Sequence, residues 1–278
     1  MNRHQRIVIA PGTGDALGAR LVEQAGFEAV YVSGYAVEGS CGNPDTGVMD
    51  GSEMAQRIEQ IAAATTLPVI ADADTGYGDA LAVMRTVRRL ERAGIAALQL
   101  EDQELPKRCG SMPEKIIVPT AAMVGKIKAA VDTREDPNLQ IIARTDVLQS
   151  EGLEAALERL SAYREAGADL LMCLGPYDKG VARDICRRTP GPLAYLNAES
   201  LTMPMIAPAE LREMGVPLVI YPTTLVLAAA RAMQQVLAVI RDSGNTEPLM
   251  GDRLVPPAAF NDIVGLPAAR AAQARYAG

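Results

Sequence analysis

The chain has 278 residues, 49% of them hydrophobic, and a formal net charge of −7 without any long basic run. This composition can bury a full core, which excludes a disordered chain, and the lack of clustered Lys and Arg excludes binding to a nucleic-acid backbone. The first residues, MNRHQRIVIAPGTG, lack the apolar stretch of a secretory signal. We therefore expect a cytoplasmic protein that acts on a small molecule.

Eight short apolar runs recur along the chain, each of a length that predicts a strand. In chain order they are RIVIAPG, EAVYVSG, LPVIADAD, AALQLED, LQIIARTD, DLLMCLG, PLAYLN and PLVIYP. Helical segments separate them, and four of these end at a glycine in the position that follows a helix: Gly26, Gly94, Gly167 and Gly215. Strands buried on both faces and alternating with helices are typical of a parallel sheet. Eight such units predict an α/β fold, a (β/α)₈ barrel over residues 1–245.

A dinucleotide fold is the rival interpretation, because GTGDALG follows the first strand. The third glycine of that fingerprint is replaced by Leu17, and the next strand ends in VYVSGY without an acid for a ribose. Near the other end, TTLVLAAARAMQQVLAVI is interrupted by Arg231 and two glutamines, so we expect a buried helix and no membrane span. Residues 246–278, with LVPPAAFNDIVGLP, are predicted to form an arm that packs on the barrel or on a neighbouring subunit.

The residue types present restrict the chemistry. The cysteines at 41, 109, 173 and 186 form no CxxC pair, and the only histidine is His4. Disulfides, zinc sites and catalytic triads or dyads that need a histidine are therefore not expected. Any catalysis must therefore use carboxylates, cationic side chains, hydroxyls or a thiol.

Paired carboxylates at a strand end indicate a metal site. Active sites of barrels lie at the carboxyl ends of the strands, and Asp72 and Asp74 stand two residues apart there, which on a strand places both on one face. Capping of the next helix is the structural alternative, but Asp79 already stands where that cap is needed. With Glu101 or Asp102 on the neighbouring strand, we expect an all-oxygen site for Mg²⁺, or for Mn²⁺ in its place.

Two further segments can serve chemistry. Arg144 ends its strand and can clamp a substrate carboxylate or form a salt bridge inside the protein, and these two roles can coexist. The segment from Glu101 to about Pro119 is long enough for a lid. It contains Cys109, a candidate proton donor whose pKa we expect Lys107 and Arg108 to lower. A loop cysteine can equally be incidental, and Lys115 can balance acids, touch substrate or be a solvated surface lysine.

These motifs resemble the isocitrate lyase and phosphoenolpyruvate mutase superfamily, nearest its short methylisocitrate-lyase-like branch. The likeness runs from about Arg6 to Thr246 and includes NPDTG, VIADADTGYG, LQLEDQ, PKRCG, IIARTD and IYP. It implies a (β/α)₈ barrel assembled as homotetramers, often with the last helices exchanged between subunits. It also implies Mg²⁺ and a 2-oxo or 2-hydroxy acid substrate.

The resemblance also implies roles for single residues. Ser33, Gly34 and Tyr35 would hold the pyruvate- or glyoxylate-like end of the substrate, and Arg144 would clamp a carboxylate. Cys109 would protonate the departing enolate. The metal and its waters would be held by Asp45, Asp72 and Asp74, with Glu101 beside them. Asn197, in PLAYLN, completes the predicted substrate-binding residues.

The sequence departs from the lyase pattern twice, since Ser111 replaces a histidine after the cysteine motif and Leu174 replaces a glutamate after the sixth strand. The leading hypothesis is an Mg²⁺-dependent carbon–carbon lyase acting on a substituted 2-hydroxy di- or tricarboxylate, similar to methylisocitrate or dimethylmalate. The alternative is a decarboxylase or hydrolase of an oxaloacetate-like 2-oxo acid. The motif KRCG favours the lyase, whereas Ser111 and Leu174 favour the alternative.

Overall fold

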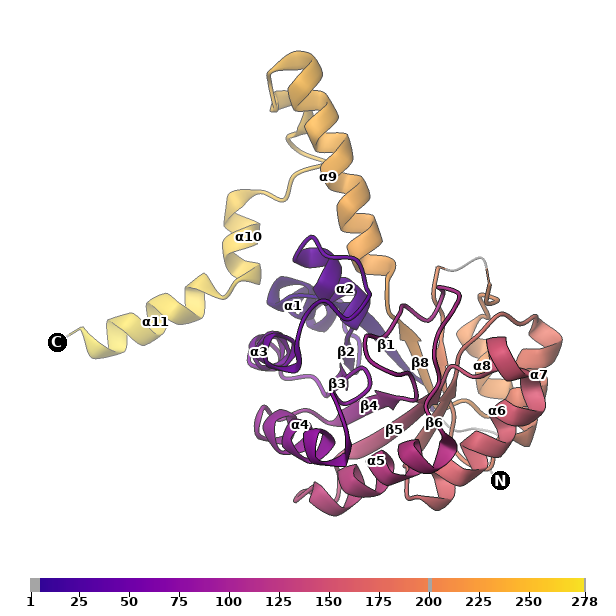
Figure 1. The fold of residues 1–278 in the computed structure, drawn as a ribbon. Coiled ribbons are helices and arrows are strands. Elements are labelled where there is room, and N and C mark those ends of the chain that lie inside the picture. The colour runs from indigo at the N-terminus through magenta and orange to yellow at the C-terminus, as the bar shows by residue number, and fades with distance from the viewer. Residues whose placement is uncertain (1–5, 200–201, 278) are drawn as a thin grey trace.

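A computed structural model describes residues 6–199 and 202–277, so His4 lies outside the described residues. In the described chain, eight strands form the centre of the molecule and helices surround them (Figure 1). The strands are β1 (Val8–Thr13), β2 (Val30–Val32), β3 (Val69–Asp72), β4 (Ala97–Glu101), β5 (Gln140–Thr145), β6 (Leu170–Cys173), β7 (Ala194–Leu196) and β8 (Leu218–Tyr221). All eight strands expected from the sequence are therefore confirmed.

The helices follow the strands in the order the sequence predicts. They are α1 (Ala16–Gln24), α2 (Gly34–Ser40), α3 (Gly51–Ala62), α4 (Ala80–Arg92), α5 (Thr120–Thr133), α6 (Leu148–Glu165), α7 (Lys179–Arg188), α8 (Pro208–Glu213), α9 (Thr224–Ser243), α10 (Pro257–Ile263) and α11 (Leu266–Tyr276), with a short 3₁₀ helix at Glu247–Leu249. Two helices, α2 and α3, lie between β2 and β3, whereas α10 and α11 follow the last strand.

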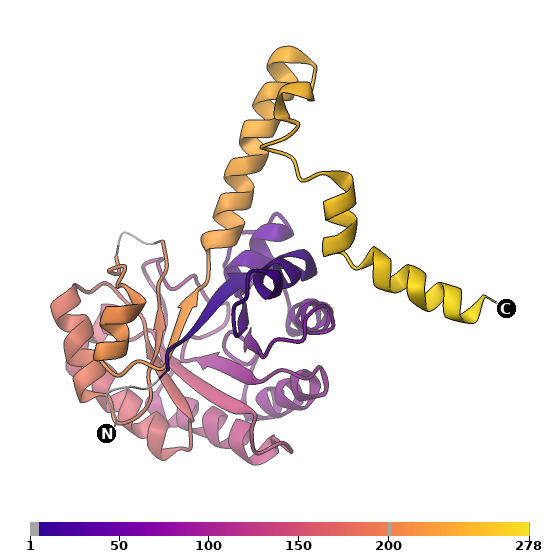
Figure 2. The ribbon, with the colours of Figure 1, turned by 180° about the vertical axis from the view of Figure 1, so that it is seen from behind.

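The strands form one parallel sheet in the order β6-β5-β4-β3-β2-β1-β8-β7. The two ends of this order meet through a parallel bridge between Leu171 of β6 and Leu193 beside β7. The sheet thus closes on itself, and the expected (β/α)₈ barrel is confirmed (Figure 2).

Local signals end and begin the helices as the sequence predicts. Four glycines that follow α1, α4, α6 and α8 take positive φ angles between 80° and 104°, a region that favours glycine: Gly26, Gly94, Gly167 and Gly215. Asp79 caps α4, because its carboxylate accepts the backbone N–H groups of Leu81 at 3.0 Å and Ala82 at 3.2 Å. With this cap confirmed, Asp72 and Asp74 remain available for other roles.

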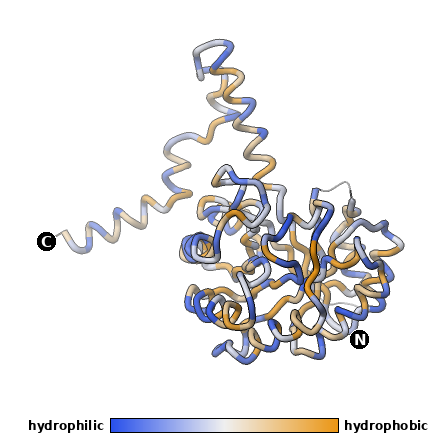
Figure 3. Tube along the Cα trace, viewed as in Figure 1, coloured by the Kyte–Doolittle hydropathy of each residue, from blue (hydrophilic) through white to orange (hydrophobic). Residues whose placement is uncertain are grey.

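Apolar side chains fill the barrel on both sides of the sheet, and the strands accordingly take the hydrophobic colour in Figure 3. The inner set includes Ala10, Tyr31, Ile70, Met172 and Ile220. Outward residues of the same strands pack against the surrounding helices. Burial on both faces explains why each strand reads as a continuous apolar run. The inner set reaches the mouth of the barrel at Leu174 and Leu196, whereas polar residues occupy the ends of β3 to β5.

Helix α9 is exposed, so the expectation of a buried helix is wrong. None of its residues is buried, and it extends away from the barrel, whereas α10 returns to contact α1 and α11 projects outward again (Figures 1 and 2). Within the described chain α9 is the one helix long and apolar enough to cross a membrane, by length and composition alone. The helix has the apolar pattern of a core helix, but within one chain only α2 and β1 make more than slight contact with it. The projection starts at Thr224, ahead of the arm predicted to begin at residue 246.

Candidate active site

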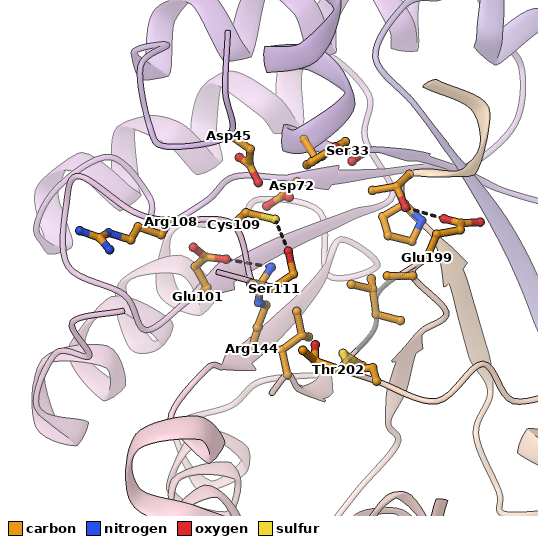
Figure 4. Close-up of a pocket in the computed structure, with 18 of the residues that line it drawn as sticks. Ser33, Asp45, Asp72, Glu101, Arg108, Cys109, Ser111, Arg144, Glu199 and Thr202 are labelled. Carbon is orange, nitrogen blue, oxygen red and sulfur yellow. Dashed lines mark hydrogen bonds and ion pairs between the residues drawn. The ribbon is translucent and has the colours of Figure 1, made fainter. Parts of the chain in front are cut away.

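A cavity of about 130 Å³ opens at the carboxyl ends of the strands, where the sequence places the site. Its wall comes from the ends of several strands and from the loop of residues 104–117, which we call the thiol loop. In Figure 4, Cys109 and Ser111 of this loop point toward each other over Asp72 and Arg144, whereas Arg108 points away from the cavity. The predicted residues Ser33, Tyr35, Asp45, Asp72, Glu101, Cys109 and Arg144 all line it.

Asp72, the last residue of β3, is oriented by three donors. Its Oδ2 accepts the Gly34 N–H at 3.3 Å, and its Oδ1 accepts the Asp74 N–H at 3.1 Å and Gln99 Nε2 at 3.0 Å. Asp74 lies beyond the strand with a φ of 48°, so the expected alternation of both aspartates along one strand is wrong. The two carboxylates still converge, since a methyl group on Gly34 would lie 3.2 Å from Asp72 Oδ2 and 3.3 Å from Asp74 Oδ1. Burial, and then the charge of Asp74, raises the pKa of Asp72.

Lys107 connects the thiol loop to two acids. Its ammonium contacts the Asp45 carboxylate and lies 2.8 Å from Asp74 Oδ1, with the side chain 4% exposed. Burial lowers the pKa of Lys107, but the charges of Asp74 and Asp45 outweigh burial and raise this pKa well above its ordinary value. Lys107 is therefore a charged anchor that neutralises carboxylates.

Arg144 forms both salt bridges that the sequence allows. Its Nε and Nη2 donate to Asp146 at 2.7 and 3.0 Å, and its Nη1 lies 2.9 Å from Glu101 Oε2. The other Glu101 oxygen, Oε1, is buried and accepts no hydrogen bond from the described residues. Burial raises the pKa of Glu101 well above its ordinary value, against the opposing charge of Arg144. A buried carboxylate oxygen without a donor is a position that an added cation stabilises.

Cys109 faces the cavity, but its thiol is not activated as expected. Burial, and then the charge of Asp45, raises the pKa of Cys109. Lys107 is committed to carboxylates, and Arg108 Nη1 lies 3.0 Å from Glu114 Oε2 on the outside of the loop. The expectation that Lys107 and Arg108 lower this pKa is therefore wrong. The Cys109 Sγ lies 3.3 Å from Ser111 Oγ, and a protonated thiol in this position can donate a proton.

Hydrogen bonds hold the thiol loop against the mouth of the barrel. The Gln103 side chain accepts the Arg108 N–H and donates to the Arg108 carbonyl, both at 2.9 Å. Lys115 Nζ donates to the Gly110 carbonyl at 2.6 Å and lies 3.3 Å from Asp146 Oδ1. Among the roles that the sequence leaves open for Lys115, the structure shows that it balances the charge of Asp146.

The predicted substrate-binding residues divide between the cavity and its support. Ser33 Oγ accepts the Ala36 N–H at 3.3 Å, and the Gly34 N–H is taken by Asp72. Asn197 does not line the cavity, because its side-chain amide bonds the backbone of Ile206 at 2.8 and 3.0 Å. Asn197 thus braces the loop after β7, and the substrate-binding role predicted for it has no support in this geometry.

The acids at the mouth fit a hard dication held through few protein ligands. In the described part of the chain, no three His, Cys, Asp or Glu side chains form a ready-made metal cluster. Mg²⁺ typically uses one or two carboxylates, and water and substrate complete its shell. The converging Asp72 and Asp74 carboxylates and the unpartnered Glu101 Oε1 match that requirement. Asp45 and Asp74 both contact Lys107, so they would act near such an ion through water or charge, which leaves Asp72 as the direct ligand.

Sequence reasoning missed one side of the cavity. Leu196, Ala198, Glu199, Met203, Pro222, Thr223 and Leu227 line it, and none of them was expected there. Leu196 and Pro222 lie at the ends of β7 and β8, so the rule that strand ends face the site could have found them. Leu227 belongs to α9, and no sequence signal places it at the mouth.

Comparisons with known proteins identify the family. A family model described as phosphoenolpyruvate phosphomutase matches residues 1–241. The chain is 42% identical to 2,3-dimethylmalate lyase of Eubacterium barkeri over 274 residues, which covers 98% of this chain and 94% of that protein. The chain belongs to the PEP mutase/isocitrate lyase superfamily.

Other members of this superfamily match over similar lengths. A 2-methylisocitrate lyase of Aeropyrum pernix is 42% identical over 259 residues, 93% of this chain and 83% of that protein. A crystal structure of 2,3-dimethylmalate lyase has a TM-score of 0.92 at 35% identity and covers 99% of this chain and 92% of its own. A phosphonopyruvate hydrolase solved in complex with oxalate and Mg²⁺ has a TM-score of 0.89 at 30% identity, with 98% and 95% covered. The superfamily therefore contains both lyases and hydrolases built on this barrel.

Proposed function

We propose that the protein is an Mg²⁺-dependent carbon–carbon lyase that cleaves a substituted 2-hydroxy di- or tricarboxylate into a 2-oxo acid and a carboxylic acid. The observation that supports it most is the placement of Asp72, Arg144 and Cys109 around one cavity. Methylisocitrate and dimethylmalate have the required form, and lyases for both are similar to this chain. The Mg²⁺ complex of a similar hydrolase supports the choice of metal.

The proposed cleavage is a retro-aldol reaction. The bond between C2 and C3 breaks, the C2 hydroxyl gives its proton to a water molecule and becomes the carbonyl of the 2-oxo acid, and the electron pair stays on C3. A bound Mg²⁺ would polarise the C2 oxygen and stabilise the negative charge that develops. Asp72, held by its three donors, is the residue that would ligate it, with Asp74 beside it.

Residues of the chain bind the substrate carboxylate and donate the proton that ends the reaction. Arg144, fixed in place by Asp146 and Glu101, presents a preorganised guanidinium to a substrate carboxylate. Cys109 Sγ–H gives its proton to C3, which completes the carboxylic acid product. Because burial raises the pKa of the thiol, the proton is present at neutral pH. The thiol loop covers the cavity and excludes water from the carbanion.

NMR detection of products in the presence of Mg²⁺ tests this function. We expect a 2-oxo acid and a second carboxylic acid in equal amounts, with turnover lost in excess chelator or in Asp72→Ala. Asp79→Ala is the matched control, because it removes an aspartate that only caps α4 and should lower stability by about 1 kcal/mol without loss of turnover. Full activity of Asp72→Ala in excess chelator would refute the metal-dependent lyase.

The second candidate is a decarboxylase or hydrolase of an oxaloacetate-like 2-oxo acid. Leu174 and Ser111, which replace polar residues of the lyase pattern, favour it, and both line the cavity. This reaction uses the same metal chelation and no thiol acid. Release of carbon dioxide, or of oxalate and acetate, from oxaloacetate with no cleavage of 2-hydroxy acids would support it over the lyase.

We also propose a homotetramer in which the last helices are exchanged between subunits. A groove of about 390 Å³ lies over the outer faces of β1 and β8, lined by Ile9, Pro11, Leu21, Phe27, Tyr221 and Leu225. In a closed barrel this face is covered by the helix after β8, but α9 projects away from it. A partner's α9 has the exposed apolar residues to cover such a groove, among them Met233, Leu237 and Ile240.

Light scattering tests the assembly. A tetramer that stays in solution without detergent would also support a cytoplasmic location over a membrane-bound one. Light scattering should give four times the mass of one chain without detergent, and Leu237→Lys should reduce that mass, because its side chain is 63% exposed in one chain. A monomer in the parent protein would refute the assembly.

A further inference from the structure

The cavity has two chemically different halves. The charged half comes from β2 to β5 and the thiol loop. The half formed by β6 to β8 and the start of α9, which we call the aliphatic half, has an apolar wall of Leu174, Leu196, Ala198, Met203, Pro222 and Leu227, beside the polar Glu199, Thr202 and Thr223. Four of these belong to the apolar cluster inside the barrel or pack against it: Leu174, Leu196, Ala198 and Met203. A ligand that spans the cavity thus has one end among charges and the other against a wall continuous with the core.

The cations around the cavity are already balanced. Among the described residues that line it, these are Lys107, Arg108 and Arg144. Lys107 contacts two carboxylates, Arg144 contacts two, and Arg108 turns outward to a glutamate. The proposed metal and Arg144 can receive two substrate carboxylates. No other cation among the described lining residues is left to pair with a third substrate carboxylate.

The charge in the aliphatic half is negative. The Glu199 carboxylate accepts the Thr223 hydroxyl at 2.5 Å and also accepts the Thr224 hydroxyl. These bonds join the segment after β7 to the start of α9 and keep the anion beside the aliphatic wall. Glu199 is exposed, so its repulsion of a substrate carboxylate is screened by solvent, but it offers that carboxylate no partner.

The thiol loop closes this half from outside. A methyl group on Gly110 would lie 2.6 Å from Leu174 Cδ2, so the loop backbone packs directly on the leucine side chain. Leu174 is 3% exposed. A carboxylate pressed against this contact would lose its water without gaining a hydrogen bond, whereas an alkyl group would gain from the same loss of water.

We infer that the aliphatic half binds an alkyl substituent, so that the preferred substrate is a 2-hydroxy dicarboxylate with an alkyl branch and not a tricarboxylate. This inference rests on the proposed lyase function and narrows its substrate class. One methyl group in an apolar pocket changes kcat/KM by about 10-fold or more. An unpaired carboxylate at the same wall adds a further cost, and we expect a total preference of about 100-fold.

The first test compares 2,3-dimethylmalate with 2-methylisocitrate in Mg²⁺, and measures kcat/KM for the parent protein. Calorimetry on Cys109→Ser, where cleavage is slowed, measures the dissociation constants of the same two compounds. No cleavage of either compound would refute the lyase proposal, while the calorimetry would still rank the two ligands. Equal or tighter binding of 2-methylisocitrate would overturn the substrate inference, whatever the cleavage assay shows.

The second test adds a cation to the aliphatic half. Leu227 is 40% exposed on the first turn of α9, so Leu227→Lys can place an ammonium at the wall without disturbing the core. The ratio of tricarboxylate to alkyl dicarboxylate kcat/KM should rise about 10-fold. Leu81→Lys, 73% exposed on α4, adds the same charge far from the cavity and should leave the ratio unchanged. An unchanged ratio in Leu227→Lys, with the parental molecular mass retained, would count against the aliphatic half as the selective surface.

Discussion

The contact between Gly110 and the mouth of the barrel can be tested by adding one methyl group. In Gly110→Ala the new carbon would lie 2.6 Å from Leu174 Cδ2, 2.7 Å from Arg144 Nη2 and 3.4 Å from Asp146 Oδ1. Gly110 does not have a positive φ, so the alanine backbone is unstrained and the effect is steric. Arg144 cannot yield easily, because two carboxylates fix its guanidinium. The loop must therefore move outward.

Overpacking of this kind costs about 1 to 3 kcal/mol. If the whole cost falls on the closed loop, the ratio of closed to open loop drops about 5- to 150-fold, since each factor of ten corresponds to about 1.4 kcal/mol. We expect kcat/KM to fall by up to that factor, and hydrogen exchange of residues 103–117 to become faster. The melting temperature should change little, because Ile117 is the one residue of the loop that packs against an apolar cluster.

A glycine elsewhere provides the matched control. Gly125 lies inside α5, and a methyl group there would meet nothing within 4 Å. Gly125→Ala should leave kcat/KM unchanged and stabilise the protein by about 0.5 to 1 kcal/mol. If Gly110→Ala keeps parental kcat/KM and parental loop protection, packing of the loop on Leu174 and Arg144 does not hold it closed, and the reasoning is refuted.

Three further predictions follow from single contacts. Cys109→Ser should lower kcat about 10²- to 10⁴-fold with a modest change in KM; in the parent, activity should be lost as pH rises through the raised pKa of the thiol, and near-parental cleavage by the variant would exclude a thiol acid. The Thr66 hydroxyl lowers the pKa of Glu23. The ionised Glu23 carboxylate therefore contributes its full stability above the ordinary glutamate pKa, and this contribution is lost as pH falls through the lowered pKa. Urea unfolding should accordingly show Glu23→Gln less stable than the parent at about pH 7, with a difference that shrinks as pH falls below the ordinary glutamate pKa, and a constant difference would contradict this cause. Lys115→Met removes a buried partner of Asp146 and should destabilise the protein by up to about 3 kcal/mol in urea unfolding, whereas a change below about 0.5 kcal/mol would show that Lys115 balances no acid.

The sequence by itself determined the barrel. Its strands are buried on both faces, so each reads as an apolar run, and the helices before β2, β4, β6 and β8 end at glycines that adopt positive φ. Because parallel strands bring their carboxyl ends to one rim, Asp72, Glu101 and Arg144 could be assigned to one cavity from their positions alone. These features are local, or repeat with the period of the fold, and need no knowledge of distant contacts.

Only the tertiary structure decided which partner each side chain meets. Lys107 and Arg108 are adjacent to Cys109 in the sequence, yet one turns to Asp45 and Asp74 and the other turns to solvent, so burial and Asp45 raise the thiol pKa. The aliphatic half is assembled from the ends of three strands and the start of α9, segments whose proximity depends on closure of the barrel. Helix α9 has the composition of a core helix, but burial depends on what lies against it, and a single chain covers too little of it to bury any of its residues.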